Sequence, residues 1–475
     1  MSKKNQNYTN RKQNRFQPER MRGNVFVNNS GKQWLPGENG KAAKVERLLR
    51  GIKEEKKEIA GNMAGYKDSG IEYIGQVPKD WEVLRLKNIS NIYAAKEYLF
   101  GEWPVKKNGK PYSPFGEWSS GNEVIITGRV GTIGQYEMLE KNPKKKILIN
   151  DNRLLIRPFT ENYRKKALSH FLFWAMAIVN LNDIITGSAV PLITATSLLK
   201  KRIVVPPLPE QQRIADFLDT KCSILDRTID AVSRQIEDLE KYKKALITKT
   251  VTKGICKKGE PERAMKDSGV EWIGEVPEEW SVKPFKTLAG MKGSSEYTAR
   301  DIVDEGEGAI LLSPSNINDN KLNLSKRTYI SQKKYDKSTT KIQRGDLLFT
   351  KTASVGKCVI YDSDEPAMPN PQLVVLKNIK CLPKFLYYSM VSDVMQAPAK
   401  MYVYGSVIPT ISQLNLGRIK IPVPSPEEQQ QITDYLDEKC KNIDNRVQKR
   451  RQQLEWLKEY KKSLIFDYVT GKKRV

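Results

Sequence analysis

The chain has 475 residues, enough for two or three domains that each bury a core. It carries 81 Lys and Arg against 55 Asp and Glu, a formal net charge of +26, which makes nucleic acid the first partner to consider and a ribosome-associated or membrane-surface protein the alternative. A membrane-spanning class is excluded, because the apolar run at 168–179 is far shorter than the roughly 18 residues that cross a bilayer.

The segment 1–65 is predicted to be a basic N-terminal extension. Residues 1–37 hold eight basic side chains and one acid, Glu19, and residues 1–22 contain no apolar stretch typical of a secretory signal, so we expect the cytoplasm. The composition indicates partial disorder, with a short helix at about 41–60. Three interpretations stay open: the extension binds DNA, binds a partner, or reflects a misassigned start.

A near-identical stretch occurs twice and indicates a duplicated unit. Lys-Asp-Ser-Gly-Ile-Glu-Tyr-Ile-Gly-Gln-Val-Pro-Lys-Asp-Trp at 67–81 returns as Lys-Asp-Ser-Gly-Val-Glu-Trp-Ile-Gly-Glu-Val-Pro-Glu-Glu-Trp at 266–280. The glycines and prolines predict an irregular lead-in that docks Trp81 or Trp280 on the domain that follows, a structural rather than a catalytic role. A Gly-Ser-x-x-Pro element also recurs, at 187–191 and 405–409.

Two globular segments, 66–208 and 255–425, differ strongly in sequence but share a pattern of strands followed by one helix. Short runs typical of strands, bounded by turn-forming residues, occur at 123–127, 146–150, 154–157, 309–312, 346–350 and 373–377. An apolar helix is predicted after each set, at 167–179 and 384–395. Both segments are therefore expected to be mixed α/β domains.

Each globular segment ends in a proline-rich helix opening. Pro-Pro-Leu-Pro-Glu-Gln-Gln at 206–212 and Pro-Val-Pro-Ser-Pro-Glu-Glu-Gln-Gln at 422–430 place proline just before a helix and glutamate in its first turn, where a carboxylate meets the positive end of the helix. The segments 209–254 and 426–475 then carry apolar residues at spacings of three, four and seven, which predicts a coiled-coil seam. The seam residues are Leu218, Leu225, Ile229, Val232, Ile236, Leu239, Leu246, Leu436, Ile443, Val447, Leu454, Leu457 and Leu464.

Two apolar stripes in one chain most economically cover each other, and the alternative is a solitary amphipathic helix on each core. Because each helix leaves its domain in the same local geometry, the pair must run antiparallel, with the domains at opposite ends. About 40 helical residues at 1.5 Å each separate the domains by roughly 60 Å. We expect an α+β protein with a pseudo-twofold internal repeat, in which a long antiparallel two-helix coiled coil separates two mixed α/β domains.

Motifs of catalysis and metal binding are absent from the sequence. The five cysteines form no CxxC pair and the only histidine is His170, so neither a zinc cluster nor a disulfide framework is indicated. A Gly-x-x-Gly-x-x-Gly spacing at 128–134 lacks the order of a nucleotide-binding loop and predicts tight turns. No P-loop is present, and the only Pro-Pro, at 206–207, lacks the Asn or Asp and the aromatic residue of an amino-methyltransferase motif. We expect no catalytic residue, metal or cofactor in this chain.

Over about residues 66–475 the chain resembles specificity subunits of type I restriction-modification systems. The resemblance is carried by the lead-ins, the Gly-Ser-x-x-Pro elements, the Pro-Glu-Gln-Gln openings and the Tyr-Lys-Lys helices (242–244, 460–462). The resemblance implies two target-recognition domains, each reading half of an interrupted site on double-stranded DNA, with helices as spacer and docking surface. It implies methyltransferase subunits, expected as two, that use S-adenosylmethionine, and ATP-driven restriction subunits. A family lead-in usually opens the chain, so segment 1–65 departs from the pattern.

Lys and Arg neutralise phosphates, whereas Arg, Asn, Gln and Thr on loops read base edges. A separation of 60 Å limits the span between half-sites to about 18 base pairs. A non-catalytic nucleic-acid-binding scaffold without sequence readout is the alternative, and an unrecognised nuclease site is a third possibility. The residues expected to contact DNA are Lys106, Lys107, Asn108, Lys110, Arg129, Asn152, Arg153, Asn316, Asn318, Lys351, Thr352, Asn370 and Gln372.

Overall fold

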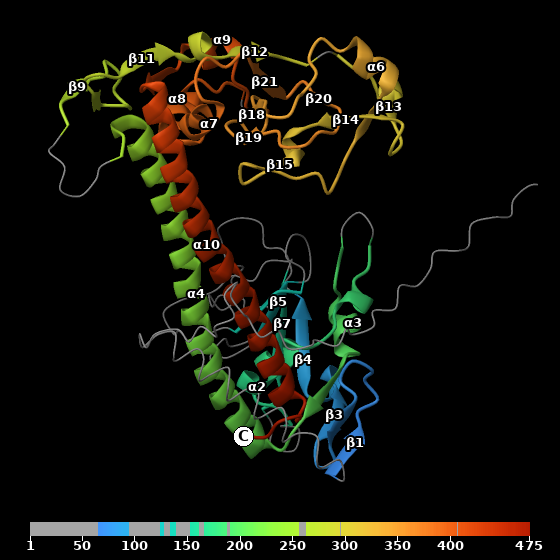
Figure 1. The fold of residues 1–475 in the computed structure, drawn as a ribbon. Helices are drawn as coiled ribbons and strands as arrows, with labels where there is room; N and C mark the ends of the chain where they lie inside the picture. The colour runs from blue at the N-terminus through green and yellow to red at the C-terminus, as the bar shows by residue number, and fades with distance from the viewer. Residues whose placement is uncertain are drawn as a thin grey trace, which may run out of the picture.

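The computed structural model describes residues 65–94, 124–127, 134–138, 153–160, 166–187, 191–255, 263–294, 296–405 and 407–475. Two globular domains lie at opposite ends of a pair of long helices, and most of each domain lies to the right of the pair in Figure 1. The expected N-terminal extension, the strand at 146–150 and the turns at 128–133 lie outside the described residues. Within those ranges, no helix combines the length and the apolarity needed to cross a membrane.

Domain 1 (65–207) contains an antiparallel sheet in the order β4-β7-β5-β6. Its strands are β4 Ser90–Ala94, β7 Arg153–Pro158, β5 Val124–Thr127 and β6 Tyr136–Met138. The other elements are β1 Tyr66–Asp68 and β2 Gln76–Pro78, which form the lead-in hairpin, β3 Glu82–Arg85 paired with β8 Arg202–Val205, the 3-10 turns Leu86–Asn88 and Asn182–Ile184, α2 Ser169–Met176 and α3 Ala195–Leu199. The β3–β8 pair ties the lead-in to the strand that enters the first long helix.

Domain 2 (263–425) repeats this plan, with a sheet in the equivalent order β12-β21-β18-β19. The repeated elements are β9 Met265–Asp267 and β10 Glu275–Pro277, β11 Ser281–Pro284 paired with β22 Lys420–Val423, then β12 Gly290–Lys292, β21 Leu373–Lys377, β18 Leu347–Thr350 and β19 Cys358–Ile360. These sheet strands are rich in Leu, Val, Ile and Phe, as buried strands are. The same strand order in both domains supports a duplicated unit.

A second sheet of domain 2 has the order β13-β17-β14-β20, with β14 and β20 parallel. Its strands are β13 Ile302–Val303, β17 Tyr329–Ser331, β14 Gly308–Leu312 and β20 Ala367–Pro369, and β15 Ile317–Asn318 pairs with β16 Lys321–Leu322. The remaining helical elements are the 3-10 turns Ala299–Asp301 and Pro314–Asn316, α5 Phe285–Leu288, α6 Gln332–Lys337, α7 Pro383–Val391, α8 Asp393–Met401 and α9 Gln413–Arg418. The two four-stranded sheets together with these helices make domain 2 a mixed α/β domain.

The helix predicted at 384–395 is wrong as a single element. The helix is interrupted at Ser392, between α7 and α8. The Ser392 hydroxyl accepts a hydrogen bond from the Val394 N–H and so caps the start of α8. A serine at this position satisfies an otherwise unpaired helical N–H, which makes a new helix start favourable. In domain 1 the expected helix at 167–179 is shorter, Ser169–Met176.

The two long helices are α4 (Leu208–Lys253) and α10 (Pro426–Val469), and they run antiparallel as predicted. Their ion pairs join Asp226 to Lys461 at 2.6 Å, Glu240 to Arg451 at 2.8 Å and Lys243 to Asp444 at 2.7 Å. Residue numbers thus rise along one helix as they fall along the other. At 46 and 44 residues, both helices exceed the length of an average globular-protein helix several-fold.

The apolar stripes pack both between the two long helices and against the domain cores. Along the middle, seam residues of the two helices share one core, whereas Leu436 packs into the core of domain 2 and Leu218 lies in the core that includes domain 1. Arg450, the position equivalent to buried Val232, is exposed and bonds to Gln453. The buried stripe residues are Leu218, Leu225, Val232, Ile236, Leu436, Ile443, Val447, Leu457 and Leu464, and the partly buried ones are Ile229, Leu239, Leu246 and Leu454.

The end of the chain packs on the beginning of domain 1. The Tyr66 hydroxyl donates to the Gly471 carbonyl at 3.0 Å, and Arg474 pairs with Asp80. At the other end, α4 continues through Gly254 into the lead-in of domain 2. The two glycines have positive φ, 74° at Gly254 and 69° at Gly471. An added Cβ at Gly471 would lie 2.6 Å from the Pro78 ring, so a side chain is excluded at Gly471.

Candidate nucleic-acid interface

The repeated tryptophans are buried anchors between each lead-in and its long helix. The Trp81 indole donates from Nε1 to Glu210 Oε2 at 3.0 Å, and Trp280 makes the same bond to Glu428 at 2.8 Å. Glu210 is only 5% exposed, so this bond satisfies a carboxylate that is otherwise costly to bury. Sequence reasoning assigned these glutamates to helix starts alone. The repeat of both partners, Trp in each lead-in and Glu in each opening, is the signal that could have paired them.

The glutamine that follows fixes the start of each domain's apolar helix. Gln211 accepts the Leu168 N–H at 2.9 Å and donates to the Lys166 and Pro206 carbonyls at 2.8 Å. Its equivalent, Gln429, accepts the Leu382 N–H at 2.8 Å and donates to the Pro424 carbonyl at 3.0 Å. Both side chains are buried. Each long helix therefore positions its domain through side-chain contacts as well as through the chain connection.

An aspartate two turns further along completes each anchor. Asp219 accepts the Trp174 indole N–H at 2.9 Å and lies 3.2 Å from Nδ1 of His170, the only histidine. The equivalent Asp437 accepts the Tyr388 hydroxyl at 2.6 Å and pairs with Lys384. Burial raises the pKa of the Tyr388 hydroxyl, and its bond to the Asp437 carboxylate raises that pKa further, so the hydroxyl stays a donor.

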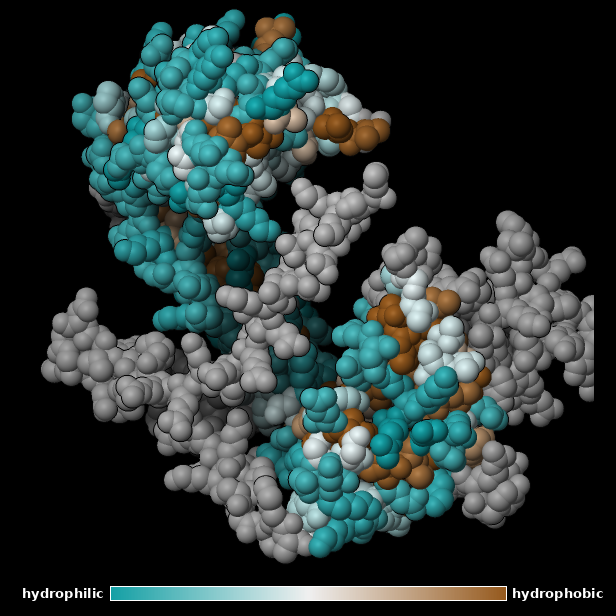
Figure 2. Space-filling view, turned by 90° about the vertical axis from the view of Figure 1, so that its right-hand side faces the viewer, coloured by the Kyte–Doolittle hydropathy of each residue, from teal (hydrophilic) through white to brown (hydrophobic). Residues whose placement is uncertain are grey.

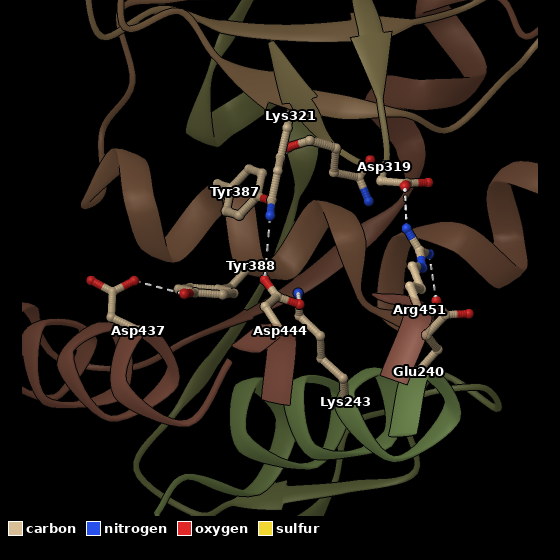
Figure 3. Close-up of polar contacts among 10 residues, drawn as sticks. Glu240, Lys243, Asp319, Lys321, Tyr387, Tyr388, Asp437, Asp444 and Arg451 are labelled. Atoms are coloured by element: carbon tan, nitrogen blue, oxygen red, sulfur yellow. Dashed lines mark hydrogen bonds and ion pairs between the residues drawn. The ribbon is translucent and has the colours of Figure 1, made fainter. Parts of the chain in front are cut away.

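A groove of about 990 Å³ separates domain 2 from the helix pair, and polar contacts cross it (Figure 3). Arg451 of α10 lies between Glu240 of α4, at 2.8 Å, and Asp319 of the β15–β16 turn, at 3.6 Å. Lys321 on the same hairpin approaches Asp444 at 3.7 Å. The turn can reach the helices because Asp319 and Asn320 both adopt positive φ, 49° and 56°. Domain 2 is thus held to the helix pair at a second place.

The structure gathers several residues that the sequence predicted to contact DNA. The Lys351 N–H donates to the Gln372 carbonyl at 2.9 Å, which brings two loops of domain 2 together. Lys351, Thr352 and Gln372 are partly buried, and Asn318 on β15 is exposed. In domain 1, the Arg153 side chain and the residues Lys106, Lys107, Asn108, Lys110, Arg129 and Asn152 lie outside the described part of the chain.

Two predicted base contacts are used inside domain 2 instead. Asn316 is 4% exposed, and its amide donates to the Asn323 carbonyl at 3.2 Å and the Lys326 carbonyl at 2.8 Å. Asn370 is 7% exposed and accepts the Gln372 N–H at 3.0 Å. Both amides shape turns, and both residues leave our set of base-contacting candidates.

The second Gly-Ser-x-x-Pro element forms a hairpin on domain 2. Tyr404 and Thr410 exchange backbone hydrogen bonds at 2.9 and 2.8 Å, and the Ala353 N–H donates to the Pro409 carbonyl at 2.8 Å. The element of domain 1 is closed in the same way, by Thr186 and Leu192 at 2.9 and 2.8 Å. Sequence reasoning noted the repeat and assigned it no role.

Within the described residues, no group of three His, Cys, Asp or Glu side chains is placed to hold a metal ion. The described cysteines, Cys222, Cys358, Cys381 and Cys440, are free thiols, and Cys256 lies outside the described residues. Burial raises the pKa of the Cys222 and Cys440 thiols to about 11. A thiol with so high a pKa is a poor nucleophile at neutral pH.

The chain is similar to known proteins along most of its length. It is 24% identical to the type I restriction enzyme MjaVIII specificity subunit of Methanocaldococcus jannaschii, over 84% of this chain and 94% of that protein. It is 23% identical to the EcoBI specificity subunit of Escherichia coli, over 78% and 81%.

A solved structure also shares the fold. One chain of a type I R-M system, from work on its complex assembly and conformational transition, matches with a TM-score of 0.58 and 16% identity, over 84% of this chain and 99% of that chain. The model of the type I restriction modification DNA specificity domain matches twice, at residues 78–241 and 277–455. Because these matches cover well over half of the chain, the protein belongs to the family of type I restriction-modification specificity subunits, with two DNA specificity domains.

Proposed function

We propose that this chain reads an interrupted DNA sequence, with one half-site contacted by each domain and the helix pair setting the distance between them. The observation that carries the proposal is the placement of two domains of different sequence at opposite ends of one antiparallel pair, through equivalent anchors at Asp219 and Asp437. Equivalent anchors give the readers equivalent orientations, and different loops give them different targets.

The anchors also sharpen the expected spacing. Domain 1 is held at Asp219 of α4, and domain 2 is held at Thr248 of the same helix, whose hydroxyl accepts the Asp393 N–H at 3.0 Å. These positions are 29 residues apart, which at 1.5 Å per residue is about 44 Å. This distance corresponds to about 13 base pairs of duplex, within the limit of about 18 that the sequence implied.

The direct contacts with DNA in domain 2 are proposed to come from Asn318, Lys351, Thr352 and Gln372. In domain 1, we propose Lys106, Lys107, Asn108, Lys110, Arg129, Asn152 and Arg153. Lysine and arginine would neutralise phosphates, while the amide and hydroxyl side chains would meet base edges in the major groove.

We further propose that this chain performs no catalysis itself and that its partners do. Methyltransferase subunits, two per chain, would dock on the helix pair with S-adenosylmethionine, and restriction subunits would supply ATP-driven cleavage. Two apolar side chains on α4, Ile224 and Tyr242, are 54% and 58% exposed and fit such a docking surface. The face of the helix pair in Figure 2 is mainly hydrophilic, whereas hydrophobic surface gathers on the two domains.

The proposal is tested by selecting duplexes from a random library with the chain in complex with its methyltransferase subunits, then sequencing the bound DNA. We expect two short fixed motifs separated by an unread gap of constant length. A single contiguous motif would contradict the two-reader arrangement. Uniform binding of all duplexes, lost alike at raised salt, would instead establish a scaffold without sequence readout.

A further inference from the structure

Exposed hydrophobic side chains are concentrated in one short segment of domain 2. Of eleven large hydrophobic residues exposed among those described, six lie between positions 401 and 414, and Val407 is the most exposed at 89%. Isolated surface hydrophobics need no explanation, but a cluster marks a contact site. The six residues are Met401, Tyr402, Tyr404, Val407, Ile408 and Leu414.

The centre of this segment is the hairpin of residues 404–410, which we call the apolar hairpin. Its ends are closed by the paired bonds of Tyr404 and Thr410, and its base is fixed to the 351–353 loop by Ala353 and Pro409. Gly405 has φ 91°, and a Cβ there would lie 2.5 Å from the Ile408 carbonyl oxygen, so the tip conformation requires glycine. The ends and the base of the hairpin are therefore fixed, and Val407 and Ile408 project into solvent.

The sequence around the apolar hairpin contains no carboxylate. No Asp or Glu occurs from 394 to 426, or from 347 to 361 in the strand and loop that support the hairpin, while Lys351, Lys400 and Arg418 lie in these stretches. The groove beside the helix pair differs, because its lysines and arginine face Asp319, Asp437 and Asp444. Stretches of chain that carry cations and no acids are complementary to a polyanion.

We propose that the apolar hairpin enters a groove of the DNA duplex and packs Val407 and Ile408 against bases and sugars. This inference rests on the proposed function and adds a contact that does not depend on sequence. Apolar side chains of DNA-binding proteins do insert between base steps. The element recurs in domain 1 as Gly-Ser-Ala-Val-Pro at 187–191, although the domains diverge, and an element common to both readers suits a feature common to all duplexes.

The test uses the full chain with its methyltransferase subunits and a fluorescent 40-base-pair duplex of random sequence, measured by anisotropy at several salt concentrations. We expect Val407→Ser combined with Ile408→Ser to weaken binding about tenfold at every salt concentration. The slope of log K against log salt should stay unchanged, because no phosphate contact is lost. The double variant Val407→Leu with Ile408→Leu keeps apolar side chains at both positions and should bind the duplex as tightly as the wild type.

A matched control is Ile302→Ser on β13, which removes a 45% exposed apolar side chain outside the 401–414 segment and should change affinity less than twofold. Wild-type affinity in the double serine variant would overturn the inference. So would normal DNA binding with loss of subunit assembly, which would show that the hairpin docks a protein. If the wild-type complex binds no duplex at all, the proposed function fails with it, whereas a failure of the hairpin alone leaves DNA reading intact.

Discussion

Trp81 and Glu210 lie 129 residues apart in the chain, and the indole of one donates to the carboxylate of the other at 3.0 Å inside the protein. Trp280 and Glu428 form the same pair in the second copy, at 2.8 Å. The lead-in and the helix opening of each repeat are thus two halves of one buried contact, which explains why both recur in the chain.

Replacing Trp81 by Phe removes the indole N–H and leaves the Glu210 carboxylate without its main donor. We expect the free energy of unfolding of domain 1 to fall by about 2 kcal/mol, the cost typical of a buried hydrogen bond to a charged group. Urea unfolding followed by circular dichroism measures this. Glu210→Gln keeps an acceptor oxygen for the indole and should cost less, and equal losses in both variants would argue against a role for this bond.

The seam is tested by placing a charge within it. Leu225→Asp or Ile443→Asp buries a carboxylate among apolar side chains, so each should lower the free energy of unfolding by more than about 3 kcal/mol and weaken assembly with methyltransferase subunits. Gln235→Asp is the matched control, because Gln235 lies on the same helix, neighbours the seam residue Ile236 and is exposed. Thermal unfolding and co-purification read out the effect, and wild-type behaviour of the seam variants would refute the packing.

The spacing role of the helices predicts a shift in the DNA site. Inserting seven residues after Ser233 in α4 and after Gln453 in α10 keeps the apolar register and lengthens the pair by about 10 Å, or about 3 base pairs. Methylated-adenine mapping in cells should show both half-motifs unchanged and a longer gap. An insertion in only one helix, as control, should disrupt the pair, and an unchanged gap in the double insertion would rule out the ruler.

The buried thiols predict a stability change at alkaline pH. Folding raises the pKa of Cys222 from 9.0 to about 11, so between these values the folded state holds a proton that the unfolded chain has released. Stability from this thiol is therefore complete below pH 9 and declines as the pH rises toward 11. The measurement compares urea unfolding of wild type and Cys222→Ala at pH 8 and pH 10.5, and the variant should lose less stability; equal losses would contradict the assignment.

The sequence predicted the helix pair because a coiled-coil stripe is a local pattern, visible in the spacing of Leu218, Leu225 and Val232. It did not predict the contacts of Gln211 or Asp219, because their partners are 43 to 49 residues away in the chain. Asn316 was assigned to DNA because an asparagine in a turn has the same sequence signature whether its amide faces solvent or closes the turn. The interruption of the helix at Ser392 has a local cap, but neither Gly nor Pro stands beside it in the sequence. The continuous apolar pattern therefore predicted one helix across this position.

The packing of the last residues on the first lead-in has a consequence for synthesis on the ribosome. Gly471 and Arg474 complete the edge of domain 1 that Tyr66 and Asp80 begin. The earliest globular part of the chain is therefore completed only after residues 471–474 have been translated, whereas domain 2 receives its equivalent contacts from α4, which is already made. A transcript interrupted just before the Gly471 codon would release a protein in which domain 2 keeps its contacts with α4 and domain 1 lacks those of Gly471 and Arg474.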